Sequence, residues 1–231
     1  MRAKLAGLAL LLLLAPAAFG ATCTSLGDGN WSNTGNWSCG AVPTVADDVV
    51  IDNGDDVTVN VANAVARNVT FNGGTANNMS LTIGSGNTLT VSQAVTFNAS
   101  TSTNRIRNII VQANAQLIVG GNLTMNTGNV TGSQLGITIA NSATALVQIG
   151  GNITYSGTVA PSITFSGAGG LNVGGSFANS ITFTRGSGTV TYYGGTAQSI
   201  GSYTYSTLTI AKTGGSATAA ADRRSGSDRN P

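Results

Sequence analysis

The chain has 231 residues, of which 8% are charged, and it contains neither histidine nor glutamate. This composition excludes catalysis by a histidine-containing triad. Because ten basic residues face eight acidic ones, it also gives no reason to expect a nucleic-acid partner.

The N-terminal residues have the pattern of an export signal. Arg2 and Lys4 precede the apolar run Leu5–Ala15, and small residues follow up to Gly20. This pattern predicts a secretory signal peptide over residues 1–20, and the run is too short to anchor the protein in a membrane. We therefore expect an exported chain, located outside the cell or on its outer surface, without a transmembrane anchor.

The next segment, residues 21–48, holds both cysteines and both tryptophans. Cys23 and Cys39 are separated by fifteen residues, and in an exported chain such a pair predicts a disulfide bond. Trp31 and Trp37 lie between them, each in a Gly-Asn-Trp-Ser unit. Two large rings beside a disulfide suit a cap on the apolar end of a fold, whereas a glycan-binding platform would need exposed ring faces. We predict the N-terminal cap and keep a glycan contact as the alternative.

An acidic stretch, "DDVVIDNGDD", follows the tryptophans. It contains most of the aspartates of the chain: Asp47, Asp48, Asp52, Asp55 and Asp56. Oxygen-rich loops of this kind can bind calcium, but the spacing matches neither an EF-hand nor a nonapeptide calcium repeat. We favour a solvated turn and expect no metal or other cofactor, with calcium at these aspartates as the alternative.

The body of the chain repeats short apolar triplets, at intervals of 18 to 32 residues. The series is VVI (49–51), LTI (81–83), IIV (109–111), ITI (137–139), ITF (163–165), ITF (181–183) and LTI (208–210). Further triplets lie between most of these, which predicts two or three strands per interval. Turns such as "GGNLTM" and "GGNITY" recur as well. At these corners we expect glycine to supply positive φ, and asparagine to stack on the asparagine of the next coil.

This repetition predicts an all-β fold, a single-stranded parallel β-helix of right-handed sense over residues 49–211. The outer residues of each triplet share one face, so about seven stacked coils would bury a continuous apolar column. An antiparallel β-sandwich is the alternative, but it does not predict turn sequences that recur at coil-like intervals. Residues 212–231 are polar and without a strand pattern, which predicts a disordered tail.

The middle residue of a triplet is often threonine. We expect an outward ladder, interrupted at Ile110, that contains Thr82, Thr138, Thr164, Thr182 and Thr209. Threonine arrays can bind ice, yet threonine is also a favourable exposed strand residue, and we predict the second role.

The coil body lacks the residues of known polysaccharide-cleaving chemistry. No Asp or Glu occurs between Val57 and Ala221, whereas glycoside hydrolysis uses two carboxyl groups. The bases of this region are scattered, without acidic metal ligands beside them: Arg67, Arg105, Arg107, Arg185 and Lys212. We therefore expect no catalytic residue and no enzyme.

Residues 23–59, "CTSLGDGNWSNTGNWSCGAVPTVADDVVIDNGDDVTV", resemble the N-terminal segment of bacterial surface and secreted β-helix proteins. The segment is similar above all to MshQ-type proteins, associated with mannose-sensitive haemagglutinin (MSHA) pilus biogenesis, and more loosely to haemagglutinin and adhesin repeat proteins. The positions that carry this resemblance are Cys23, Trp31, Trp37, Cys39, Pro43, Asp48, Val50 and Ile51.

The resemblance implies a non-enzymatic structural or adhesive module, with cell-surface or pilus components, or host or environmental glycans, as partners. Such relatives are usually longer, so we expect this chain to be the N-terminal part of a longer surface or pilus-associated protein. A carbohydrate-binding or carbohydrate-processing β-helix is the alternative.

Overall fold

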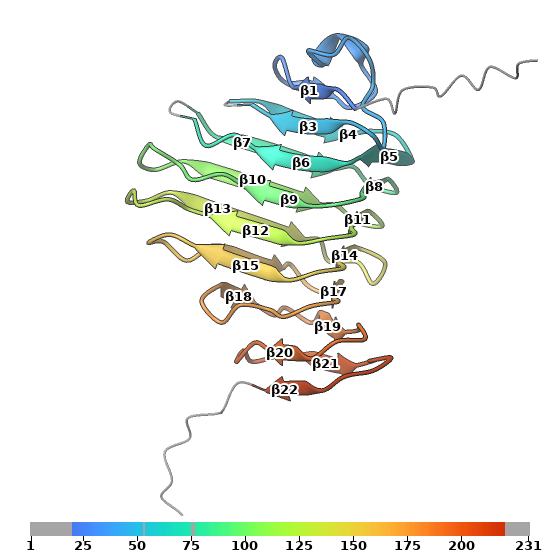
Figure 1. The fold of residues 1–231 in the computed structure, drawn as a ribbon, viewed down its shortest axis with the longest axis vertical. Helices are drawn as coiled ribbons and strands as arrows, with labels where there is room; N and C mark the ends of the chain where they lie inside the picture. The colour runs from blue at the N-terminus through green and yellow to red at the C-terminus, as the bar shows by residue number, and fades with distance from the viewer. Residues whose placement is uncertain (1–19, 53, 75–76, 220–231) are drawn as a thin grey trace, which may run out of the picture.

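The computed structural model describes residues 20–52, 54–74 and 77–219, so nearly all of the predicted signal peptide lies outside it. The described chain winds as an all-β parallel solenoid, in which successive turns add strands to three parallel sheets (Figure 1). The stack makes about six turns, close to the predicted seven. The predicted parallel β-helix is thus confirmed, while its right-handed sense stays a prediction.

Three sheets run along the stack. The first contains, in spatial order, β1 (Thr22–Thr24), β3 (Asp48–Ile51), β6 (Asn68–Phe71), β9 (Val95–Phe97), β12 (Leu123–Asn126) and β15 (Ile153–Ser156). The second contains β2 (Gly29–Asn30), β4 (Asp56–Val59), β7 (Met79–Ile83), β10 (Ile106–Val111), β13 (Gln134–Ile139), β16 (Ser162–Phe165) and β18 (Thr182–Thr184). The third contains β5 (Asn63–Ala66), β8 (Thr88–Val91), β11 (Gln116–Val119), β14 (Leu146–Ile149), β17 (Gly170–Val173), β19 (Thr189–Tyr192) and β21 (Thr207–Ile210).

Three further elements lie at the two ends of the stack. Near the N-terminal end is the 3-10 turn η1 (Thr34–Asn36), and at the C-terminal end β20 (Gln198–Ile200) pairs in parallel with β22 (Ala217–Ala219). No helix within the described ranges is long and apolar enough to cross a membrane.

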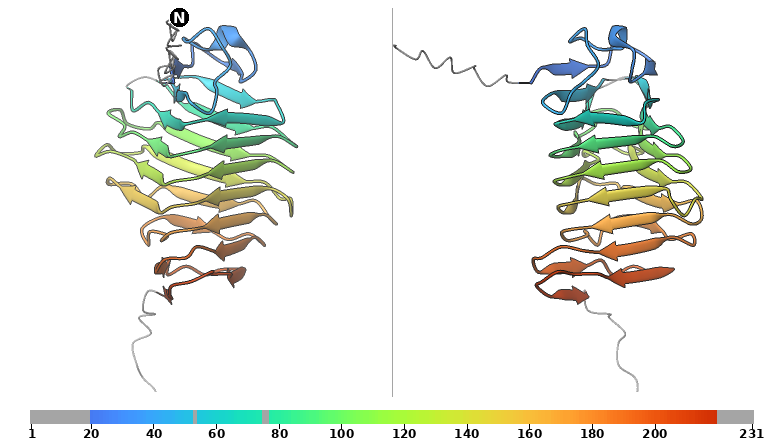
Figure 2. Two further views of the ribbon diagram at one scale, coloured as in Figure 1. Left: turned by 45° about the vertical axis from the view of Figure 1, so that its right-hand side comes forward. Right: turned by 90° about the vertical axis from the view of Figure 1, so that its right-hand side faces the viewer.

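The core is a column of side chains stacked in register. In the third sheet one row of this column, which runs along the stack, consists of Leu89, Leu117, Val147, Leu171 and Val190, each at most 1% exposed. Alternate residues of the same strands point outward and are partly exposed, as the period of a strand requires. Burying one such aliphatic side chain contributes roughly 1.5–3 kcal/mol, so the column is the main source of stability. Figure 2 shows the strands stacked along its length.

The apolar triplets are shared among all three sheets. The first of the series, residues 49–51, lies in the first sheet, and the last, residues 208–210, lies in the third. Only the triplets between them belong to the second sheet. The interval between triplets therefore measures a whole turn only where both belong to one sheet.

The expected threonine ladder is correct in part. Thr82, Thr138 and Thr164 align through Ile110, as predicted. Thr209 instead lies in the third sheet, and the residue beside Thr164 is Thr184 rather than Thr182. The coil before β18 spans 20 residues between register partners, not the 18 that separate the two ITF triplets. A shift of two residues keeps every side chain on its own face, so the triplet pattern does not reveal it.

The glycine pairs of the recurring turns stack directly on one another. A Cβ on Gly150 would overlap the carbonyl oxygen of Gly120, and a Cβ on Gly174 would overlap that of Gly150. None of these three glycines has positive φ, so the expected reason for their presence is wrong. Corner backbones of adjacent coils are roughly 5 Å apart, and this close approach leaves no room for a side chain.

Asparagines beside these glycines connect the coils. The Oδ1 atom of Asn122 accepts a hydrogen bond of 2.8 Å from the backbone N–H of Asn152, whose own Oδ1 accepts one of 2.7 Å from Ser176. The predicted stacking is present, but each amide binds the backbone of the next coil rather than the next amide.

One inward position holds a cation. Arg107 stands in register with Met79 and Leu135 and is 1% exposed. Its guanidinium donates to the carbonyl oxygen of Asn98 and, at 3.4 Å, to the hydroxyl of Ser133. Burial lowers the pKa of Arg107 to about 10, so that it remains charged at neutral pH. Arg107 is therefore part of the core beneath the second sheet, a position that was not predicted for it from the sequence.

The solenoid extends beyond both predicted boundaries. In the segment expected as a separate cap, β1 and β2 pair with β3 and β4, and in the expected tail β22 pairs with β20. These terminal strands have two or three residues, too few to show the alternation that marks a strand in a sequence. The remainder of the expected tail, residues 220–231, lies outside the described residues.

Candidate functional site

The N-terminal end of the stack is closed by a covalently linked segment. Cys23 and Cys39 form a disulfide bond with a Cα–Cα distance of 4.9 Å, which confirms the predicted pairing. Cys23 belongs to β1, which adjoins β3 in the first sheet, so the bond attaches the returning chain directly to the first coil.

Both tryptophans are buried in this segment. Trp31 is 0% and Trp37 1% exposed, and their rings meet edge to face with centroids 5.0 Å apart. The indole N–H of Trp37 donates to the carbonyl oxygen of Trp31 at 2.8 Å. A sugar stacks on an exposed ring face, and neither ring offers one. The arrangement has the features of a cap that covers the inward apolar side chains of the first coil.

The two Gly-Asn-Trp-Ser units have different local structures. The first, residues 29–32, enters β2, and the backbone N–H of Trp31 donates to the carbonyl of Thr58 at 2.8 Å. The second, residues 35–38, begins inside the turn η1, whose N-cap Asn33 accepts from Gly35 at 3.0 Å, and Trp37 is the residue at which this turn ends. One unit therefore adds to a sheet and the other turns the chain back, which brings both rings together.

Reduction of the disulfide should destabilise the solenoid from its N-terminal end. A closed loop of this length contributes roughly 3 kcal/mol, largely by restricting the unfolded chain. We expect the free energy of unfolding in urea to fall by about that amount when a reductant is added. The double variant Cys23→Ala/Cys39→Ala should be less stable by a similar amount and insensitive to reductant. Equal stability of reduced and oxidised protein would contradict this role.

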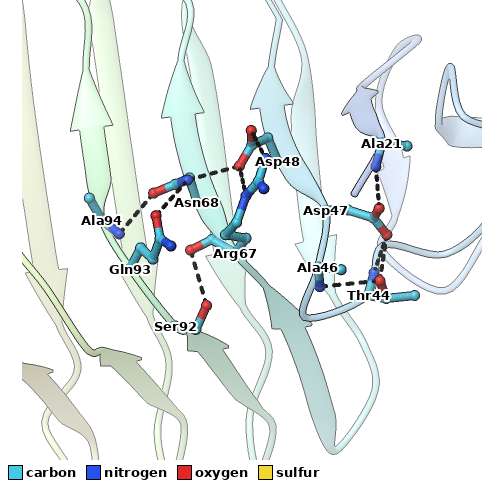
Figure 3. Close-up of polar contacts among 10 residues, drawn as sticks. All are labelled: Ala21, Thr44, Ala46, Asp47, Asp48, Arg67, Asn68, Ser92, Gln93 and Ala94. Carbon is cyan, nitrogen blue, oxygen red and sulfur yellow. Dashed lines mark hydrogen bonds and ion pairs between the residues drawn. The ribbon is translucent and has the colours of Figure 1, made fainter. Parts of the chain in front are cut away.

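Asp47 organises the loop that enters the first coil (Figure 3). Its carboxylate accepts hydrogen bonds from the backbone N–H of Ala21 at 2.6 Å and from the backbone and hydroxyl of Thr44 at 2.8 and 2.7 Å. The hydroxyl of Thr44 above all lowers the pKa of Asp47. The side chain therefore serves as a structural acceptor.

Asp48 faces outward on β3 and joins the first two coils (Figure 3). The guanidinium of Arg67 donates to both of its oxygens, with Nε at 2.8 Å from Oδ1, and Asn68 of β6 donates at 2.8 Å. Hydrogen bonding from Arg67 is the main cause of the lowered pKa of Asp48. Asn68 in turn accepts from the backbone of Ala94 at 3.1 Å, so the contact continues to the third coil.

The remaining aspartates of the acidic stretch bind separate partners. Asp52 accepts from Asn72 at 2.8 Å, and Asp56 accepts from Ser80 at 2.7 Å. Asp55 accepts from the hydroxyl of Ser25 at 2.5 Å. Among the described residues, no three Asp, Glu, Cys or His side chains are close enough together to hold a metal ion. The structure therefore does not bring these residues together as a calcium site.

Acidification should weaken the contact between Asp48 and Arg67. Because the pKa of Asp48 is lower in the folded protein than the ordinary value of 3.8 for an aspartate, the ionised form stabilises the fold above that pH. This contribution is lost as the pH falls below 3.8 through the lowered pKa.

We expect Asp48→Asn to be less stable than the parent at neutral pH and to lose less stability on acidification, in urea unfolding followed over pH 2–6. Arg67→Gln should reproduce the neutral-pH loss, and the double variant should lose less than the sum of the two. Identical pH profiles for the parent and Asp48→Asn would contradict the assignment.

An open groove of about 340 Å³ lies beside the end of the first sheet, next to β15. It forms where the next coil joins β15 only through the isolated bridge between Ile153 and Phe177. Its lining is uncharged and combines amide and hydroxyl groups with apolar side chains: Asn152, Ile153, Thr154, Ser176, Phe177, Ala178, Asn179 and Ser199. Sequence reasoning did not find this groove. The one available signal was the shortened triplet interval before residue 181.

The geometry defines a parallel β-solenoid whose N-terminal end is closed by a disulfide-linked tryptophan pair. The family model described as a domain of unknown function, DUF8693, matches residues 22–162, more than half of the sequence, and the chain belongs to this family. The match begins with β1 and reaches the first residue of β16, so it includes the closed end and most of the coils. No curated protein and no solved structure matches the chain. The resemblance to MshQ-type and adhesin proteins stays a prediction.

Proposed function

We propose that this protein is a non-enzymatic structural or adhesive module outside the cell, which holds outward-facing side chains at fixed spacing toward cell-surface or pilus components. The observation that carries the proposal is the continuous buried core, which extends from Trp31 to Val190. A solenoid with one continuous core has no hinge between domains, so it can transmit position and orientation along its length.

The polar contacts support the same role. Asp48 and Arg67 join the first two coils, and Asn122 and Asn152 join later coils. Near the C-terminal end, Lys212 donates to the carbonyl oxygen of Thr196 at 2.6 Å. Each of these side chains binds another part of the solenoid. They add rigidity to the stack, which is the property that a spacer or presenting module needs.

The disulfide supports an extracellular location. Disulfide bonds persist in oxidising compartments and are rare in the cytosol of most organisms. Together with the predicted signal peptide over residues 1–20, the bond between Cys23 and Cys39 favours export.

Surface location and attachment can be tested in the producing cells. An epitope inserted at the exposed turn at Gly86, which has positive φ and lies between β7 and β8, should leave the coils intact. We expect an antibody to label intact cells and deletion of the protein to reduce attachment or surface assembly. A variant without residues 2–20 is the control and should be labelled only after permeabilisation. Labelling of the full chain only after permeabilisation would contradict the proposal.

A carbohydrate-binding role is the second candidate, and the groove beside β15 is the observation that favours it. Amide and hydroxyl groups such as those of Asn179, Thr154 and Ser199 suit the hydroxyls of a neutral sugar. This candidate no longer depends on Trp31 and Trp37, because both rings are buried.

A glycan array can distinguish the two candidates. If the groove binds sugar, Thr154→Arg should fill it and abolish array binding without changing the melting temperature. Thr124→Arg is the matched control, since Thr124 lies in register with Thr154 one coil earlier and outside the groove. Loss of binding in both variants, or in neither, would contradict a sugar site in this groove.

A further inference from the structure

The last strand of the third sheet, β21, carries two inward apolar side chains, Leu208 and Ile210, that are open to solvent and that we call the open rung. Leu208 and Ile210 stand in register with Val190 and Tyr192 of β19. Val190 and Tyr192 are at most 1% exposed, whereas Leu208 is 40% and Ile210 47% exposed. Among the described residues, the core column is therefore open at this end on the side of the third sheet, at the red end of the ribbon in Figure 1.

The same strand presents an unpaired edge. Within the described part of the chain β19 is its one sheet partner, and all four residues of β21 are exposed. Edge strands are usually protected by lysine, proline, a bulge or an inward-pointing charge. The sequence of β21, Thr-Leu-Thr-Ile, has no charged residue and no proline. Free backbone groups and two apolar side chains thus occur together on one strand.

The two ends of the solenoid differ in what they offer a partner. At the N-terminal end the core is covered by Trp31 and Trp37, and the edge strands β1 and β2 have only three and two residues. At the C-terminal end β21 offers four residues and an open rung. Residues 220–231 contain no Val, Leu, Ile, Met or aromatic residue with which to cover it.

Among the described residues of this end, two cations, Lys212 and Arg185, are bound by other parts of the solenoid. Lys212 donates to the carbonyl of Thr196 at 2.6 Å and to Gln198 at 2.7 Å, and Arg185 donates to the carbonyl of Tyr205 at 3.2 Å. Both cations are therefore bound by the solenoid itself. A surface with an apolar rung and an unpaired strand edge fits a partner with the same two features.

We propose that two copies of this chain join through their C-terminal ends, with β21 of one copy against β21 of the other across a two-fold axis. Such an axis makes the two edge strands antiparallel, so that their free N–H and C=O groups pair. Leu208 and Ile210 of each copy then cover the open rung of the other. The product is a double-length rod with a disulfide-closed end at each tip, which gives any binding element two copies and hence avidity.

Light scattering coupled to size-exclusion chromatography of the purified chain tests this proposal. We expect a dimer that persists at high salt, because its contact is apolar. Leu208→Lys/Ile210→Lys should raise the dimer dissociation constant at least about tenfold, while circular dichroism and a cooperative urea transition should show that the monomer still folds. The control Leu26→Lys/Val45→Lys changes the exposed apolar residues of the N-terminal end and should leave the dimer intact.

A second measurement does not depend on the charged variants. Thr209→Cys should give covalent dimers on mild oxidation, whereas Ser32→Cys, exposed at the opposite end, should not. A monomer at all concentrations would overturn the proposal. So would a concentration-dependent series of oligomers that Leu26→Lys/Val45→Lys disrupts and salt weakens, because this is the behaviour of a head-to-tail contact with the acidic end.

Discussion

Stacking of each inward side chain on its counterpart one coil away is the interaction on which this protein depends. A single turn has an apolar face that it cannot bury alone, and burial becomes complete only when a coil lies on either side. Leu117 is fully buried because Leu89 and Val147 flank it, whereas Leu208 has a neighbour on one side and remains 40% exposed. The same requirement explains why the inward side chains of the first coil lie beneath Trp31 and Trp37.

Polar side chains and glycines fix the register of this stack rather than supplying most of its stability. A slip of one residue would turn every inward side chain of the slipped strand toward solvent. Contacts that can form in only one register therefore favour the correct alignment of the coils, even when each contact is weak. Asn122 with Asn152, and Asp48 with Arg67, are such contacts. Gly120 and Gly150 add a steric condition, because a side chain at either position would meet the next backbone.

Candidate functional surfaces occur where the repeat is interrupted. Within regular coils the backbone groups are paired with neighbouring coils, and few are left for a ligand. The groove beside β15 forms where the next coil continues the first sheet only by the bridge between Ile153 and Phe177. The open apolar side chains of β21 occur where this strand has no further partner among the described residues. A sugar would use the first surface and a second copy of the chain the second, so the two proposals concern different parts of the molecule.

The sequence by itself determined the fold class, the inward and outward faces of the triplets, and the disulfide. These follow from local alternation and from the presence of only two cysteines in a chain that is predicted to be exported. Tertiary structure decided three other features: the sheet to which residues 208–210 belong, the partner of Thr164 and the inward position of Arg107. Each depends on the number of residues between strands, and turn length is set by corner packing that triplet patterns do not encode. For the same reason, only the folded chain showed that Asp48 binds Arg67 and that both tryptophan rings are buried.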